Sequence, residues 1–146
     1  MTALSGRLDG AVHRLAQRVY YEDTDFSGLV YHASYLRFLE RGRTEWLRAL
    51  GVGQREMHEG GERAAFVVRR MTIDWIRPAL MDDLIDIETR PVALAGASVT
   101  LAQRVLRAGT VLVEAQALIA VLADGRPRRL PRSAREAIAA TMETAP

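Results

Sequence analysis

Residues 34–51, SYLRFLERGRTEWLRALG, form the longest regular pattern in the 146-residue sequence. Apolar or small side chains recur along this segment at helical spacing and share one face: Tyr35, Leu39, Gly42, Trp46 and Leu50. The pattern predicts a helix of about 16 residues that has Ser34 as its N-cap and ends at Gly51. Because glycine is a poor helix former, we expect a strand backbone to approach the helix at Gly42.

Strand patterns surround this helix. Residues 14–22 alternate between apolar and polar side chains, with Tyr21 expected on the buried side. Four further strand candidates follow the helix, joined by short connections with turn residues: 64–78, 83–95, 97–108 and 110–124. We expect residues 52–62 to be irregular and residues 132–143 to form a final helix. One long helix on one antiparallel sheet predicts a two-layer α+β domain.

The length and composition indicate one domain. We expect residues 1–12 to be a flexible N-terminal extension and residues 13–146 to form the domain. With 49% hydrophobic residues, the domain can bury a core. The first residues lack the continuous apolar run of a signal peptide. The sequence contains no uncharged apolar stretch of about 18 residues, so we expect no membrane span. We therefore expect a cytoplasmic protein.

The composition excludes several chemistries. Cysteine is absent, so the protein has no thiol nucleophile and no thiolate metal site. All 20 basic residues are arginine, which excludes a Schiff-base or P-loop lysine. His13, His32 and His58 are too widely separated to form a metal-binding motif, and we expect neither metal nor cofactor. The net charge of +2 gives little support for a nucleic-acid partner, and we expect none.

Carboxylates gather just before the predicted helix, in residues 20–33, YYEDTDFSGLVYHA. Taken singly, Asp25 can be a capping or turn residue, Gly28 a turn residue and His32 a surface histidine. Taken together, they stand where a helix presents unpaired N–H groups and partial positive charge, which can polarise a carbonyl and stabilise an oxyanion. A carboxylate beside that carbonyl could attack its carbon or activate a water, which indicates acyl transfer.

The same residues carry a resemblance. The run 20–47, with its D-T-D-x-x-G-x-V-Y-H-x-x-Y core and R-x-E-W-L ending, resembles the 4-hydroxybenzoyl-CoA thioesterase-like hotdog family. It is most similar to the branch of small acyl-CoA thioesterases associated with the bacterial Tol-Pal system. Residues 67–89, VVRRMTIDWIRPALMDDLIDIET, and 124–131, DGRPRRLP, extend the similarity. The resemblance implies a hotdog fold, in which a five-stranded antiparallel sheet wraps a long central helix.

The resemblance also implies an active site. Asp25 takes the position of the family's catalytic carboxylate, which serves as nucleophile or as general base toward water. The backbone N–H groups around Tyr31 and His32 take the position that holds the thioester carbonyl, and the His32 side chain is expected to orient water, substrate or Asp25. Tyr21 and Asp23 are expected to support the loop. The expected substrate-binding residues are Gly28, Val30, Glu40, Arg69 and Arg70, with the two arginines as candidates for the CoA phosphates.

The implied activity is hydrolysis of an acyl-CoA thioester, or of an acyl carrier protein thioester, to a free acid and a thiol. Family assemblies imply a homodimer or homotetramer with the active site at a subunit interface, beside the strand around residues 66–71. Two alternatives remain open: a hotdog hydratase or dehydratase acting on acyl thioesters, and a non-catalytic module that binds acyl-CoA or a carrier protein. Release of thiol without a change in acyl unsaturation distinguishes hydrolysis from both.

Overall fold

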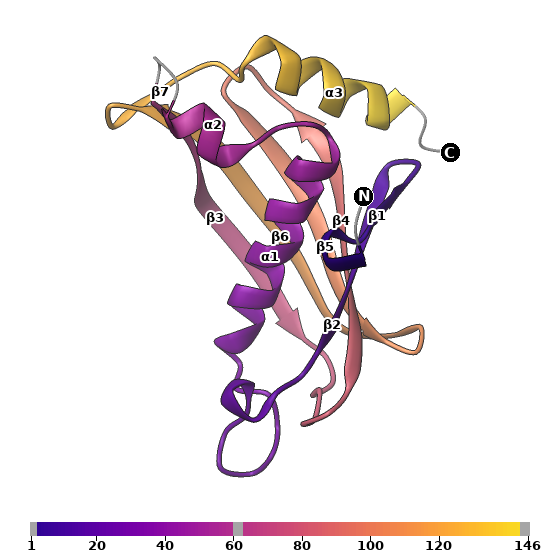
Figure 1. The fold of residues 1–146 in the computed structure, drawn as a ribbon. Helices are drawn as coiled ribbons and strands as arrows, with labels where there is room; N and C mark the ends of the chain where they lie inside the picture. The colour runs from indigo at the N-terminus through magenta and orange to yellow at the C-terminus, as the bar shows by residue number, and fades with distance from the viewer. Residues whose placement is uncertain (1–2, 60–62, 144–146) are drawn as a thin grey trace.

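A computed structural model describes residues 3–59 and 63–143, in which one antiparallel sheet curves around a long helix (Figure 1). The strands are β1 (Arg7–Asp9), β2 (Val12–Arg18), β3 (Ala64–Trp75), β4 (Leu84–Leu94), β5 (Ser98–Arg107), β6 (Thr110–Ala123) and β7 (Arg126–Pro127). The helices are α1 (Ser34–Ala49), α2 (Gln54–Glu59) and α3 (Arg132–Glu143), with short 3₁₀ turns η1 (Ala3–Ser5) and η2 (Tyr21–Asp23). The strand order is β1-β2-β4-β5-β6-β3, with β7 paired to β6, so β3 forms one edge of the sheet.

The core lies between α1 and the concave face of the sheet. Alternate side chains of the long strands point toward α1, and their apolar members are buried against its apolar face. Five large side chains of α1 are at most 2% exposed: Tyr35, Phe38, Leu39, Trp46 and Leu47. Because burying one such side chain contributes about 1.5–3 kcal/mol, packing rather than helix propensity holds α1 in place.

The helices largely match the sequence-based predictions. α1 spans 16 residues, Gly51 follows it with a φ of +80°, and α3 occupies the predicted segment. The N-cap prediction is wrong: Ala33 stands at the cap, and the Ser34 hydroxyl donates to the backbone oxygen of Asp23. Across residues 3–59 and 63–143, no helix has both the length and the hydropathy that crossing a membrane requires.

The sheet contains seven strands rather than the predicted five, because two short strands join the five long ones. The segment 1–12, predicted as a flexible extension, supplies β1. Asp9 pairs with Val12 across a hairpin turn, in which Gly10 adopts a φ of +63°. β7 pairs with the end of β6 after a second tight turn at Gly125.

Two other segments differ from their predictions. β2 ends at Arg18, and Tyr21 lies in η2 with its side chain 80% exposed, so Tyr21 is not on a buried strand face. α2 occupies six residues of the segment 52–62 that the sequence predicts to be irregular. Both differences involve very short helical turns, which the periodicity of a sequence signals weakly.

Gly42 allows α1 to lie close against the sheet. A Cβ atom on this residue would come within 2.7 Å of Ile87 Cγ2 and 3.0 Å of Thr89 Oγ1. It would also lie 3.2 Å from Gln103 Nε2. The close approach is therefore made by strand side chains, and not by the strand backbone that the sequence predicts.

We expect Gly42→Val to lower the free energy of unfolding by about 2–3 kcal/mol, because its methyl groups need the space that Ile87 and Thr89 occupy. Urea unfolding followed by circular dichroism measures the loss. Arg41→Val is the matched control: Arg41 is exposed on the same helix, so the change carries only the helix-propensity cost of below about 1 kcal/mol. Equal losses in the two variants would contradict the steric explanation.

His13, on β2, is fully buried and holds the N-terminal turn η1 to the sheet. Its Nε2 lies 2.8 Å from the backbone oxygen of Ser5, which requires the ring to donate there. Its Nδ1 is buried with no partner among the described residues. Burial lowers the pKa of His13 below its ordinary value of 6.5, so the folded protein keeps this imidazole neutral at pH 7.

We expect the free energy of unfolding to fall as the pH drops from about 7.5 to about 5.5, because His13 gains a proton near pH 6.5 when unfolded and only at a lower pH when folded. Each unit of pKa lowering is equivalent to about 1.4 kcal/mol. Urea unfolding at the two pH values measures the fall. His13→Gln keeps a donor for Ser5 and should lose most of this pH dependence; an unchanged dependence would contradict the assignment.

Candidate active site

The carboxylate-rich segment folds into a tight turn that leads into α1. Thr24 and Val30 form an isolated antiparallel bridge at its base. Within the turn, the backbone N–H of Asp25 donates to the Leu29 oxygen at 2.8 Å, and the N–H of Gly28 donates to the Asp25 oxygen at 3.1 Å. Gly28 has a φ of +83°, which glycine adopts without strain. Asp25 therefore stands at the beginning of this turn, where its side chain is exposed.

The Asp25 carboxylate is exposed and held mainly by Ser27. Its Oδ1 accepts hydrogen bonds from the Ser27 backbone N–H and from the Ser27 hydroxyl. These two bonds hold the pKa of Asp25 below its ordinary value, so the group is ionised at neutral pH. The Leu29 backbone N–H lowers the pKa of this carboxylate as well, and the group otherwise faces solvent, where it can act on a substrate.

Asp23, the first aspartate of the D-T-D motif, has a supporting position. Its side chain is 7% exposed, and its two oxygens accept from the Tyr20 backbone N–H at 2.9 Å and from Arg37 Nη2 at 3.1 Å. Its backbone oxygen accepts from the Tyr31 N–H and the Ser34 hydroxyl, both at 3.0 Å. Asp23 thus ties the loop to the first turn of α1, which agrees with the predicted support.

The start of α1 presents two free N–H groups. The Tyr31 N–H is engaged by Asp23, in contrast to the expectation that it holds a carbonyl. The N–H groups of His32 and Ala33 have no acceptor among residues 3–59 and 63–143. Ala33 is the N-cap and its side chain cannot cap the helix. Because free N–H groups at a helix start carry partial positive charge, they suit a carbonyl oxygen or an oxyanion.

A cavity of about 230 Å³ lies beside the start of α1. Val30, His32 and Tyr35 line one side of it, and Trp75 and Arg77 line the other. The Trp75 indole N–H donates to the backbone oxygen of His32 at 3.3 Å, and the two rings meet edge to face at 5.9 Å. His32 therefore lies at the rim of this cavity, and no hydrogen bond in the described part of the chain joins it to Asp25.

The remaining predicted site residues lie apart from this cavity. Glu40 is exposed on α1, about two turns beyond its start, and lines a different cavity. Arg69 and Arg70 are exposed on the edge strand β3, where its pairing with β6 shifts in register. Neither arginine lines the cavity beside His32. Their assignment to the CoA phosphates stays a prediction.

Sequence reasoning missed three groups that the fold brings to the cavity. Trp75 ends β3, and Arg77 follows it in the loop before Pro78. The buried Tyr35 lines the cavity as well, and its hydroxyl accepts the Ala79 N–H at 2.9 Å. The I-R-P sequence signals a turn, but only the fold shows which loop lies against the start of α1.

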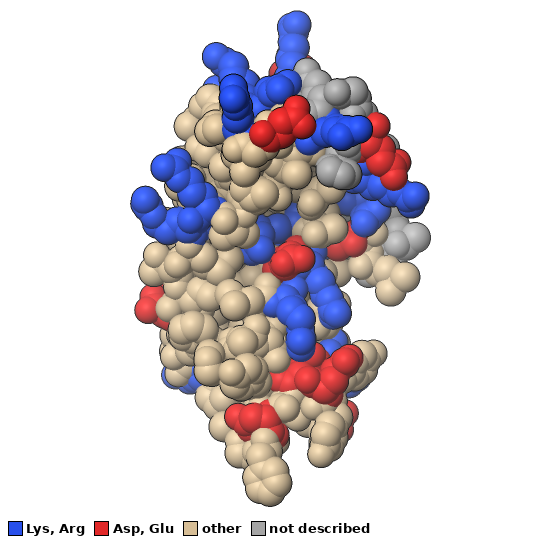
Figure 2. Space-filling view, turned by 90° about the vertical axis from the view of Figure 1, so that its left-hand side faces the viewer, with Lys and Arg blue, Asp and Glu red and all other residues tan. Residues whose placement is uncertain are grey.

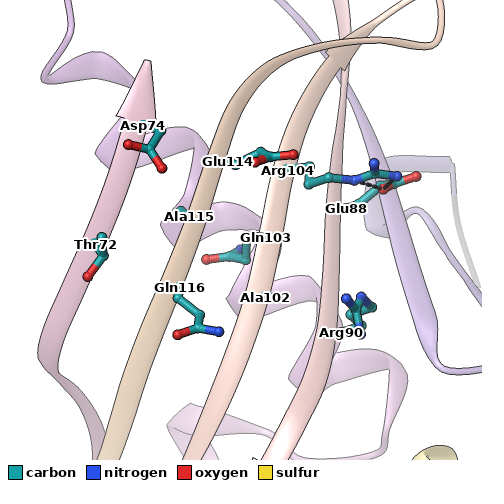
Figure 3. Close-up of a pocket in the computed structure, with 10 residues that line it drawn as sticks. All are labelled: Thr72, Asp74, Glu88, Arg90, Ala102, Gln103, Arg104, Glu114, Ala115 and Gln116. Carbon is teal, nitrogen blue, oxygen red and sulfur yellow. Dashed lines mark hydrogen bonds and ion pairs between the residues drawn. The ribbon is translucent and has the colours of Figure 1, made fainter. Parts of the chain in front are cut away.

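A larger hollow, of about 420 Å³, lies on the outer face of the sheet (Figure 3). Two of its charged groups pair with each other, since Arg104 donates to Glu88 at 2.7 and 2.9 Å; Arg14, outside the hollow, donates to the other Glu88 oxygen at 3.1 Å. In Figure 3, α1 lies behind the strands that carry these side chains. The described residues contain no group of three His, Cys, Asp or Glu side chains that could hold a metal ion.

A long helix wrapped by an antiparallel sheet, with a carboxylate turn before free N–H groups at the helix start, defines a hotdog domain equipped for thioester chemistry. The chain belongs to the Thioesterase superfamily, whose family model matches residues 27–114. The sequence-based assignment to the hotdog thioesterase family is thereby confirmed.

Relatives extend the match over most of the chain. The chain is 41% identical over 129 residues to the acyl-CoA thioester hydrolase YbgC of Escherichia coli O6:H1, covering 86% of this chain and 95% of the relative. A probable thioesterase from Bartonella henselae has a similar crystal structure, with 47% identity, a TM-score of 0.80, and coverage of 83% of this chain and 100% of that one. A 4-hydroxybenzoyl CoA thioesterase mutant, complexed with 4-hydroxybenzoyl CoA, has the same fold at 18% identity and a TM-score of 0.81. The match covers 88% of this chain and 99% of that one.

Proposed function

We propose that this protein is an acyl-CoA thioesterase, which hydrolyses an acyl-CoA to a free acid and coenzyme A. The observation that carries the proposal is the ionised, exposed Asp25 carboxylate on a turn that leads into the free N–H groups of His32 and Ala33. The name of the 41%-identical relative supports the same activity. An acyl carrier protein thioester is a second donor, because it presents the same bond.

The geometry supports a mechanism without a metal. The thioester carbonyl oxygen accepts from the His32 and Ala33 N–H groups, which stabilise the developing oxyanion by about 3–4 kcal/mol. The Asp25 carboxylate either attacks the carbonyl carbon, forming a mixed anhydride that water then cleaves, or removes a proton from an attacking water. Either route breaks the C–S bond, and the departing thiolate takes a proton from solvent. Thiolates are good leaving groups, so no strong general acid is required.

A second copy of the chain completes the site in this proposal. β3 is a 12-residue edge strand, and no described strand pairs with its outer side. Figure 2 shows that the lowest part of one face, at the end of the molecule where the loop before α1 lies, carries acidic and no basic side chains, whereas arginines gather higher up. CoA phosphates need cations, and arginines of a partner across β3 would add to Arg77 of the same chain in a homodimer or homotetramer.

Individual roles follow from this arrangement. Arg69 and Arg70, on the edge strand, are our candidates for the CoA phosphates, and His32 is our candidate for orienting water or substrate. Gly28 and Val30 shape the turn and the cavity wall beside the thioester, and Glu40 lies farther along the acyl path. The sequence without cysteine fits a reducing compartment, and we propose the cytoplasm.

Release of free thiol from a panel of short, medium, long and aromatic acyl-CoAs tests the proposed function. We expect one thiol and one free acid per substrate consumed, with acyl unsaturation unchanged. If crotonyl-CoA gains water across its double bond and releases no thiol, the protein is a hydratase. If acyl-CoAs bind without any turnover, it is a binding module.

A further inference from the structure

A second cavity, of about 210 Å³, lies between α1 and β3 at the level of the middle of α1. Its walls are part polar and part apolar, and the apolar part includes Phe66, Leu101 and Ile119. Arg43 and Trp46 of α1 also line it, and Glu40 stands at the side nearer the start of the helix. Sequence analysis assigns no role to Arg43 or to the Trp46 indole N–H.

The Arg43 guanidinium has N–H donors to spare in this cavity. Arg43 is 8% exposed, and among the described residues its guanidinium has one hydrogen-bond acceptor, Gln103 Oε1 at 3.0 Å. Glu40 attracts Arg43 through charge alone, without a hydrogen bond in the described part of the chain. The Trp46 Nε1 is buried and has no partner there either. The Trp46 Nε1 is closed off from the cavity, whereas the Arg43 guanidinium has more N–H donors than acceptors and suits a ligand that supplies acceptor oxygens.

Arg43 is held in place before any ligand arrives. Gln103 donates from Nε2 to the Leu39 backbone oxygen and to Thr89 Oγ1, both at 2.9 Å. These two bonds fix the orientation of the amide and point its oxygen at Arg43. The absence of a side chain on Gly42 gives Gln103 the space to reach α1. The guanidinium is therefore positioned by a buried network, unlike a mobile surface arginine.

Both this cavity and the one at the candidate active site are lined by residues of α1 and β3, at different levels of the helix. At the start of α1, His32 contacts Trp75 of β3; farther along, Glu40 and Arg43 face Phe66 and its neighbours. The rise from His32 to Glu40 is about 12 Å at helical spacing. A fully extended chain gains roughly 1.2 Å per bond, so an acyl chain of about ten carbons spans this distance.

We propose that this cavity binds the far end of the acyl group and that Arg43 selects acyl chains carrying an oxygen, as a hydroxyl or a carboxylate, at that end. The inference rests on the proposed thioesterase function and names its substrate class. The volume is suitable, since a cavity of about 150 Å³ holds a benzene ring. A polar end group pairs with the donors, while the methylene chain contacts the apolar wall.

Matched substrates test this selection. Plain, ω-hydroxy and ω-carboxy acyl-CoAs of six, eight and ten carbons are compared by kcat/KM from thiol release. At one or more of these chain lengths, we expect the wild type to have a kcat/KM at least about tenfold higher for an oxygen-bearing acyl-CoA than for the plain acyl-CoA of the same length. Arg43→Gln should bring that ratio to within about twofold. Arg41→Gln, an exposed arginine on the same helix, should leave it unchanged.

The outcomes separate the two proposals. If plain acyl-CoAs are the best substrates and Arg43→Gln affects all substrates equally, the selection is refuted while the thioesterase function stands. If no substrate releases thiol, the thioesterase function is refuted. Calorimetric binding of decanoate, 10-hydroxydecanoate and decanedioate then tests separately whether the cavity prefers an oxygen-bearing chain end. Tighter binding of an oxygen-bearing acid by the wild type, lost in a folded Arg43→Gln variant, supports the proposed role of the cavity; equal binding of the three acids overturns it.

Discussion

Asp25→Asn is expected to lower kcat for acyl-CoA hydrolysis at least about a hundredfold and to leave KM nearly unchanged. The amide has the same size as the carboxylate, and its oxygen can still accept the bonds from Ser27 that hold the turn. What the variant loses is the ionised oxygen that attacks the carbonyl or activates water. Steady-state thiol release measures the effect, and thermal unfolding shows whether the turn and the fold persist.

Glu22→Gln serves as the matched control for charge, because Glu22 is an exposed carboxylate in the same loop. It should retain activity within about twofold of the wild type. If Asp25 is only a turn residue, Asp25→Asn will behave like Glu22→Gln. Activity of Asp25→Asn within about threefold of the wild type would therefore remove Asp25 from the catalytic machinery.

Asp23→Ala is expected to lower both the free energy of unfolding, by about 2–3 kcal/mol, and kcat, by at least about tenfold. The reason is that the buried carboxylate accepts from the Tyr20 N–H and from Arg37, and its loss removes both bonds and leaves the Tyr20 backbone without its anchor. The free N–H groups of His32 and Ala33 would then lose their fixed relation to Asp25. Urea unfolding and thiol release measure the two effects separately.

Arg37→Met removes the ion pair alone and is the control for Asp23→Ala. Arg37 is 57% exposed, so its loss should cost below about 1 kcal/mol and change kcat little. A comparable loss in both variants would show that the ion pair, and not the anchoring of the Tyr20 backbone, supports the loop. An Asp23→Ala variant with full activity would show that the loop needs no anchor.

The long elements were predictable from the sequence because their signals are local. The apolar stripe of residues 34–51 predicts α1, and the alternating segments with their turn residues predict the five long strands. The short strands β1 and β7 were not predicted, since each is defined by pairing with another strand rather than by its own pattern. The fold class therefore follows from residues near one another in sequence.

The site was predictable only in part, because it depends on contacts between distant residues. The D-T-D motif and the helix start identify Asp25 and His32, but sequence cannot show that the Asp23 backbone occupies the Tyr31 N–H. Nor can it show that Trp75 reaches His32, 43 residues away in the chain. Likewise, the burial of Arg43 against Gln103 appears only when α1 lies on β5.

The most direct test of the account is a crystal structure of Asp25→Asn with a bound acyl-CoA that the wild type hydrolyses. We predict that the thioester carbonyl oxygen lies within hydrogen-bond distance of the His32 and Ala33 backbone N–H groups. We also predict that the side chain of residue 25 faces the carbonyl carbon, with room for attack or for one water. A carbonyl bound elsewhere, with both N–H groups still free, would contradict the assignment of this turn and helix start as the active site.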